Sequence, residues 1–356
     1  MAKYGLENVD LATLDANLNV QGVNPLAVDV NNYLIGRGDT TGVNDPRTIS
    51  VWSGTPPFPT SPASQVDDIT AAGTYSINTD QYPLLQAIIL DDTGGAQNLT
   101  VTGNTDVLVA TGNGTNTVTL QDHGNDTVYV GTGSNTVTGG SGSDSIFGAG
   151  SADSLTASSG AHSLLYDSGD NATLVGGAGA HDRLDAGAGA DDSLVAGGSH
   201  ATLQGGSGVG DTLNGGSSAD VWLVAGTGRD AVLTATGPND LLFTGHGDHA
   251  YVQAFGHGDA IYAGGAEGSG VGQGTLVAGG NDEQVHIGRH GNDTIIGSGS
   301  GDAVYFDDQA YGHGQGITIS TNHAGVTTVS FADTGQHFKV SGVQTLNFSD
   351  GHVIHL

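Results

Sequence analysis

The chain has 356 residues, and its 37 Asp and Glu against seven Lys and Arg give a formal net charge of −30 at pH 7. So few cationic side chains argue against binding to nucleic acid, whose phosphates need Lys and Arg, and against an anionic membrane surface. The chain has no Cys, which excludes disulfides and thiol catalysis. No apolar run follows the first residues, so we expect neither a conventional signal peptide nor a membrane span.

Residues 1–90 differ from the rest of the chain because they hold most of its prolines, with four of them in 56–62. Proline at this density favours extended or loop structure. A short helix fits residues 11–18, and the apolar run 82–90 predicts a buried strand. Two interpretations stay open for this segment. It is either an N-terminal cap, which a solenoid needs over an open end, or an assembly segment that docks on another subunit.

A near-nonapeptide repeat follows, and its plainest copy covers residues 139–147 with the sequence GGSGSDSIF. The pattern is G-G-x-G-x-D-x-U-x, where U is a large apolar residue, and weaker copies begin at Gly148, Gly215 and Gly288. A period this short cannot form an ordinary globular core. Each copy must bury its apolar residue against the next one, so the chain is expected to coil into a solenoid.

The large apolar residue of each repeat recurs every nine or ten residues, with one longer step from Ile261 to Leu276. A helix would need apolar residues at a spacing of three to four, whereas short strands between Gly-rich turns fit this spacing. The sequence therefore predicts an all-β fold, a parallel β-roll or β-solenoid. The predicted apolar ladder is Leu108, Val118, Val128, Val137, Ile146, Leu155, Leu164, Leu174, Leu184, Leu194, Leu203, Leu213, Trp222, Val232, Leu242, Tyr251, Ile261, Leu276, Val285, Ile295 and Val304.

Two residues before each ladder position lies a candidate metal ligand, and 13 of these 21 positions are Asp. Calcium takes six to eight oxygens from carboxylates and backbone carbonyls, both of which a Gly-rich turn with Asp supplies. Asp also favours turns on its own, but here it keeps a fixed phase with both Gly and the ladder. The predicted calcium ligands are Asp126, Gly139, Gly140, Gly142, Asp144, Asp153, Asp182, Asp192, Asp211, Asp220, Asp230, Asp240, Asp259, Glu283, Asp293 and Asp302.

Alternate turns of a two-strand coil stack on the same edge of the solenoid. We expect calcium to fill one edge more fully, along 126–144 and 220–302, and the other edge mainly along 192–230. The long step near 267–273 could shift the phase of the last turns. Because the excess of acid would repel itself in a compact rod, metal binding should couple to folding.

Near the C-terminus, residues 317–320, 326–331 and 338–340 alternate apolar and polar side chains, which predicts antiparallel strands that close the roll. The sequence thus divides into an N-terminal cap or assembly segment (1–90), a calcium-binding roll (91–306) and C-terminal capping strands with a tail (307–356).

The G-G-x-G-x-D turns resemble those of the RTX (repeats-in-toxin, haemolysin-type) calcium-binding family, over roughly residues 98–356. The resemblance implies a parallel β-roll in which Asp and Gly carbonyls hold several calcium ions. It also implies type I secretion from a Gram-negative bacterium to the cell surface or medium, and the stretch 343–352 is similar to family tails near the secretion signal. Only the turn 139–144 matches without change, so we expect several other turns to be empty.

Catalytic motifs are missing from the sequence: it has no H-E-x-x-H helix, no G-x-S-x-G elbow and no P-loop. We therefore expect a non-enzymatic structural subunit that self-associates as a surface layer, filament or biofilm matrix. One alternative is an adhesin for glycans or host surfaces. Another is a carbohydrate lyase or epimerase, which needs a base and a cation near the sugar carboxylate. The 14 histidines, among them His246, His249 and His257, leave a zinc or copper site open.

Overall fold

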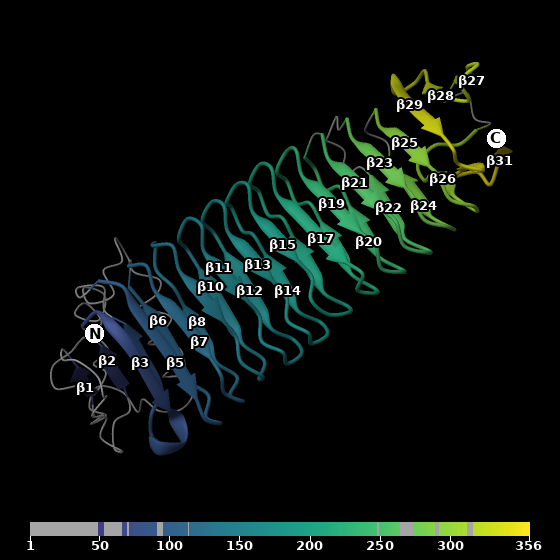
Figure 1. The fold of residues 1–356 in the computed structure, drawn as a ribbon. Helices are drawn as coiled ribbons and strands as arrows, with labels where there is room; N and C mark the ends of the chain where they lie inside the picture. Colours follow the sequence, from purple (N-terminus) through teal and green to yellow (C-terminus); the bar gives the residue numbers. More distant parts are fainter. Residues whose placement is uncertain are drawn as a thin grey trace. The chain divides into compact units, whose positions relative to one another are not determined.

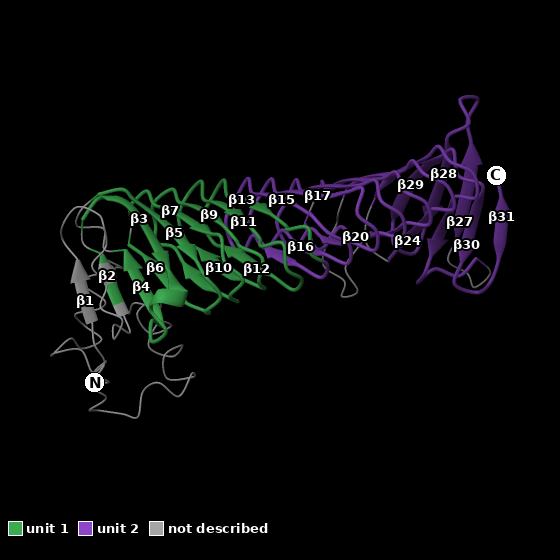
Figure 2. Cartoon of the chain, turned by 60° about the horizontal axis from the view of Figure 1, so that its bottom comes forward, with its two compact units in different colours: residues 1–179 green, residues 180–356 purple. Residues whose placement is uncertain are grey.

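The computed structural model describes residues 49–52, 66–69, 71–90, 95–112, 114–247, 249–263, 273–288, 292–311 and 316–356. Within these ranges the chain forms β-strands and one short 3-10 helix, η1 (Thr79–Gln81), as the all-β prediction requires. The helix predicted over 11–18 lies outside the described residues. None of the described helical segments is long and apolar enough to cross a membrane. The chain divides into two compact units, residues 1–179 and 180–356, which Figure 2 shows in green and purple.

Unit 1 contains two parallel sheets, and from β2 onward the chain alternates between them strand by strand (Figure 1). Each coil after β1 thus contributes one strand to each sheet. The first sheet has the order β1 (Ile49–Trp52), β2 (Val66–Ile69), β4 (Ala87–Leu90), β6 (Leu108–Thr111), β8 (Thr127–Tyr129), β10 (Ser145–Gly148) and β12 (Leu164–Asp167). The second has β3 (Gly73–Asn78), β5 (Gln97–Thr102), β7 (Thr117–Leu120), β9 (Thr136–Thr138), β11 (Ser154–Thr156) and β13 (Thr173–Val175).

Unit 2 repeats this plan and ends in antiparallel strands. Its first sheet has the order β14 (Arg183–Asp185), β16 (Thr202–Gln204), β18 (Trp222–Val224), β20 (Leu241–Phe243), β22 (Ala260–Ala263), β24 (Gln284–Ile287), β26 (Ala303–Phe306), β30 (Thr345–Phe348) and β31 (Val353–His355). Its second sheet has β15 (Ser193–Val195), β17 (Thr212–Gly216), β19 (Val232–Ala235), β21 (Tyr251–Ala254), β23 (Thr275–Ala278), β25 (Thr294–Gly297), β29 (Gln336–Ser341), β28 (Thr327–Phe331) and β27 (Ile317–Thr321).

The core of each unit is the apolar ladder between its two sheets. Val128 pairs in register with Ile146, and Ile146 with Leu165, and all three side chains are fully buried. The neighbouring residues point outward because side chains alternate along a strand. Each fully buried Val, Ile or Leu contributes roughly 1.5–3 kcal/mol relative to an exposed one, so the ladder stabilises the coils through contacts between neighbours.

The predicted ladder is wrong by one residue at five positions. Trp222 is 51% exposed and Tyr251 40% exposed, while Leu223 and Val252, the residues that follow them, are fully buried. A ten-residue repeat places its extra residue in the turn, which moves the buried position forward by one. By register, the buried ladder residues are Val109, Leu165, Leu223, Leu233 and Val252 in place of Leu108, Leu164, Trp222, Val232 and Tyr251.

The long step before Leu276 does not shift the phase. Val252 pairs with Leu276 in the second sheet, and Ile261 pairs with Val285 in the first. The register of both sheets is therefore the same on either side of residues 264–272.

The C-terminal prediction of antiparallel strands is confirmed. β27 pairs antiparallel with β28, and β28 with β29, while β29 itself runs parallel to β25. In unit 1, the predicted strand 82–90 is shorter than expected, since only β4 (Ala87–Leu90) is a strand and all four of its residues are buried.

Aromatic side chains form a column on the outer face of the first sheet of unit 2. Phe243, Tyr262, His286 and Tyr305 come from neighbouring strands, and successive rings stack with centroids 4.9, 4.6 and 4.8 Å apart. Cross-strand aromatic pairs of this kind stabilise a sheet. Because the ring faces are covered by the neighbouring rings, the column stabilises the sheet and leaves few ring faces open for a sugar to stack on.

Candidate metal centres

The inward turn position, two residues before each ladder residue, forms a column along each edge of the solenoid. Several aspartates at this position accept a hydrogen bond through Oδ1 from the backbone N–H of the inward residue in the preceding coil. These N–Oδ1 distances are 2.9 Å for Asp126 to Asp144 and 2.9 Å for Asp240 to Asp259. The bonds hold each carboxylate in place between two stacked turns.

The second carboxylate oxygen distinguishes two kinds of turn. In Asp144, Asp153, Asp259 and Asp302, Oδ2 accepts an N–H of its own turn at 3.0 Å. In Asp126, Asp211 and Asp240, Oδ2 is buried and has no hydrogen-bond partner within the described structure, and the same holds for both oxygens of Glu283.

A buried carboxylate oxygen is costly unless a positive group lies beside it. The orphaned oxygens of Asp126, Asp211, Asp240 and Glu283 therefore fit a bound cation, which would supply the missing charge.

Backbone carbonyls supply further oxygens in the same turns. A Cβ atom at Gly142 would overlap the carbonyl oxygen of Gly124, and one at Gly280 would overlap that of Gly256. The turns stack so closely that only glycine fits, and their carbonyl oxygens form a column beside the carboxylates. Carboxylate and carbonyl oxygens together are the ligand set that a hard cation such as calcium prefers.

Burial raises the pKa values of several inward carboxylates. Burial raises the pKa of Asp126 to about 9, and the adjacent Asp122 adds to the effect. Burial also raises the pKa of Glu283 to about 9, with further contributions from the charges of Asp259 and Asp302. For Asp240, burial raises the pKa to about 7. A bound cation favours the ionised form, so it would reverse these shifts.

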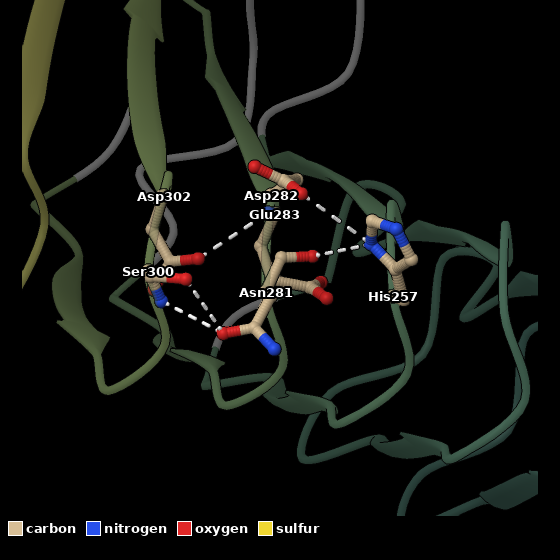
Figure 3. Close-up of polar contacts among 6 residues, drawn as sticks. All are labelled: His257, Asn281, Asp282, Glu283, Ser300 and Asp302. Atoms are coloured by element: carbon tan, nitrogen blue, oxygen red, sulfur yellow. Dashed lines mark hydrogen bonds and ion pairs between the residues drawn. The ribbon is translucent and has the colours of Figure 1, made fainter.

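The longest run of inward carboxylates lies on the first edge of unit 2, where Asp240, Asp259, Glu283 and Asp302 follow one another in four coils. Figure 3 shows the end of this run, where the Glu283 N–H donates to Asp302 Oδ1 at 3.3 Å. A more exposed layer of contacts surrounds it. His257 Nδ1 donates to the Asn281 carbonyl at 3.0 Å and lies 3.6 Å from Asp282 Oδ2. The run thus has a buried carboxylate column and a polar outer rim.

Most of the predicted ligands occupy inward positions and are buried. Around the plainest repeat, Gly140 N–H donates to Asp144 Oδ2, and Gly139 N–H bonds the Thr156 carbonyl of the next coil. The predicted acidic ligands in the buried columns are Asp126, Asp144, Asp153, Asp182, Asp192, Asp211, Asp240, Asp259, Glu283, Asp293 and Asp302.

Asp220 and Asp230 lie outside these columns, so the structure does not place these two predicted ligands at inward turn positions. Both have positive φ angles, 57° and 60°, and largely exposed side chains that approach His200 and His249 at 4.0 and 3.6 Å. The inward positions belong to Val221 and Ala231, which are buried and apolar. The cause is the extra turn residue that displaced the predicted ladder.

Asp122 is a candidate ligand that the repeat pattern does not contain. It occupies the place of Gly140 in the turn of the preceding coil, since the Ser141 N–H bonds its carbonyl at 3.0 Å. Its side chain is buried, and neither carboxylate oxygen has a hydrogen-bond partner in the described structure. The D-x-G-x-D spacing of Asp122, Gly124 and Asp126 is the sequence signal that identifies it.

Histidine gives no comparable site. Within the described ranges, no group of three or more His, Cys, Asp or Glu side chains is arranged to hold a metal ion.

Comparison with known families agrees with this oxygen-rich geometry. Residues 123–161 match the model of the RTX calcium-binding nonapeptide repeat, in four copies. These repeats and the parallel β-solenoid fit an RTX β-roll family. Its repeats bind calcium at multiple sites. Neither the curated proteins nor the solved structures contain a match to the chain.

Proposed function

We propose that this calcium-binding β-roll is a secreted structural subunit that self-associates at the surface of a Gram-negative bacterium, as a surface layer, filament or biofilm matrix. RTX proteins are typically secreted, and type I export of an unfolded chain would keep it away from calcium until it leaves the cell. The observation that carries the proposal is the set of buried carboxylate oxygens without partners, which ties the fold to calcium.

Self-association is supported by the strand at the end of the first sheet in unit 2. Among the described strands β31 pairs with β30 alone, and Val353 and Leu356 are 46% and 48% exposed. An unpaired strand edge readily pairs with a strand of another chain. If the partner strand lies elsewhere on a second copy, the contact is head-to-tail and extends into a filament. We propose that residues 1–90 dock on this neighbour or cap the roll, and that residues 307–356 carry the closing strands.

Size-exclusion chromatography with light scattering tests this proposal. In millimolar calcium we expect compact particles that grow with protein concentration, and in chelator an expanded monomer. The double variant Val353→Lys with Leu356→Lys should remain compact but monomeric in calcium, because charge on an edge strand prevents pairing. Val209→Lys is the control, since Val209 is exposed to a similar extent, 49%, and lies in a turn. A compact monomer at every concentration would contradict the structural role and leave the calcium-dependent fold in place.

A further inference from the structure

Three buried amides occupy inward turn positions in successive coils of unit 1: Gln97, Asn116 and Asn135. Asn116 and Asn135 accept the same inter-coil hydrogen bond as the carboxylates, whereas Gln97 Oε1 is buried without a hydrogen-bond partner in the described structure. The Gln97 N–H donates to Asn116 Oδ1, and the Asn116 N–H to Asn135 Oδ1, both at 3.2 Å. The amide and carboxylate turns thus share one geometry and differ in the second atom of the side chain.

That second atom is a nitrogen that donates to the carbonyls of the turn. Asn135 Nδ2 lies 3.1 Å from the Gly131 oxygen, 2.7 Å from the Gly133 oxygen and 3.2 Å from Asp153 Oδ1. A carboxylate in the same place would put an oxygen against these three oxygens. A cation would then be needed between the carboxylate oxygen and these three oxygens, because buried acceptor oxygens that face one another are costly.

The other two amides make corresponding contacts. Asn116 Nδ2 donates to the carbonyls of Gly112 and Gly114 at 3.5 and 3.3 Å. Gln97 Nε2 donates to those of Ile69 and Ala71 at 2.7 and 3.0 Å. On the opposite edge, the inward position between Gln97 and Asn116 is Val107, which is buried and apolar and needs no ion. The position between Asn116 and Asn135 on that edge is Asp126, whose buried Oδ2 has no partner in the described structure.

We propose that the amides of Gln97, Asn116 and Asn135 replace calcium on their edge of the roll, so that β5, β7 and β9, which form one sheet, stay folded without the ion. The inference rests on the proposed calcium dependence of the carboxylate turns. In a repeat protein, each coil is stabilised by its neighbours and folding can begin at one place and spread. The strands of the amide edge are then the place where folding begins, and the carboxylate turns of unit 1, Asp126 among them, become ordered when calcium binds.

Hydrogen exchange of the full-length chain, measured by mass spectrometry in chelator and in millimolar calcium, tests the proposal. We expect β5, β7 and β9 to be protected in both conditions, and β20, β22, β24 and β26 to be protected only with calcium. If all of these strands lose protection in chelator, calcium-dependent folding stands and the amide proposal is overturned. If all keep their protection in chelator, the calcium dependence itself fails, and the amide proposal fails with it.

The isosteric variant Asn135→Asp tests the role of the nitrogen. In this variant, β7 and β9 should lose their protection from hydrogen exchange in chelator and regain it in calcium. A calorimetric titration should show that the variant binds one calcium ion more than the unmodified chain. Asn98→Asp is the matched control, because Asn98 is exposed on β5 and the change adds the same charge outside the column. Protection of Asn135→Asp that is unchanged in chelator, or that calcium fails to restore, would overturn the proposal.

Discussion

The amide coils of unit 1 and the carboxylate run of unit 2 are built on the same turn, but they differ in how the turn carbonyls are satisfied. Asn135 donates hydrogen bonds to two carbonyls of its turn, whereas Asp240 keeps a buried Oδ2 without a partner. The difference between nitrogen and oxygen at one position decides whether the turn is complete in itself. Because coils interact only with their neighbours, this choice sets the calcium dependence of each region locally.

Removing a carboxylate from the run should have the largest effect on this comparison. Asp259→Ala loses the bonds from the Asp240 and Gly256 N–H groups as well as a calcium ligand. We expect about 3 kcal/mol or more of lost stability in calcium, since each buried group left unpaired costs about 1–3 kcal/mol. Urea unfolding in millimolar calcium measures it.

Asp282→Asn is the control for this change. Asp282 lies on the exposed outer rim with a φ of 58°, which Asn tolerates. A surface change of this kind should stay within about 0.5 kcal/mol. Equal effects of the two variants would contradict the assignment of the buried column.

The next largest effect should be the change in stability with pH. In chelator the folded chain retains protons on Asp126 and Glu283, whose pKa values are raised to about 9, while the unfolded chain releases them near pH 4. Without calcium, the fold should therefore be most stable near pH 4 and give way to the expanded form as the pH rises toward 9, and this loss should disappear in calcium. Urea unfolding followed by circular dichroism at several pH values checks this. A stability in chelator that rises over this range would be the opposite of the expected sign.

Exchanging one oxygen for nitrogen in the carboxylate run should have a smaller and reciprocal effect. Asp240→Asn removes a charged ligand, so calcium affinity should fall by roughly tenfold or more, since affinity follows the number of charged ligands. The same variant should be more stable than the unmodified chain in chelator, because the new N–H satisfies the turn carbonyls. Calorimetry and urea unfolding give the two values, and lower stability in both conditions would be inconsistent with the comparison.

The smallest effect is expected at the two displaced aspartates. Asp220→Asn and Asp230→Asn change exposed side chains outside the column, so the number of bound calcium ions should stay the same. Asp211→Asn, a change within the column, should lower the number of bound calcium ions. Loss of an ion in either of the first two variants would restore them as ligands.

The fold could be predicted from the sequence because the repeat fixes where strands, turns and buried residues recur. The phase of the ten-residue repeats could not, since Trp222 and Leu223 are both apolar, as are Tyr251 and Val252, and only pairing with neighbouring coils decides which one faces inward. The amide contacts could not be predicted for a related reason. The repeat shows which residue occupies the inward turn position. It does not show which carbonyl or N–H groups the second polar atom of that side chain contacts, because these groups come from the stacked backbone of the turns.

The most direct test of the central claim is a crystal structure grown in calcium, with anomalous diffraction used to locate the ions. Ions should lie between the stacked turns beside Asp126 and Asp144 and along Asp240, Asp259, Glu283 and Asp302, with none at Asn116 or Asn135. Ions held at the exposed Asp220 and Asp230, or at the amide turns, with none along the carboxylate run, would contradict the account.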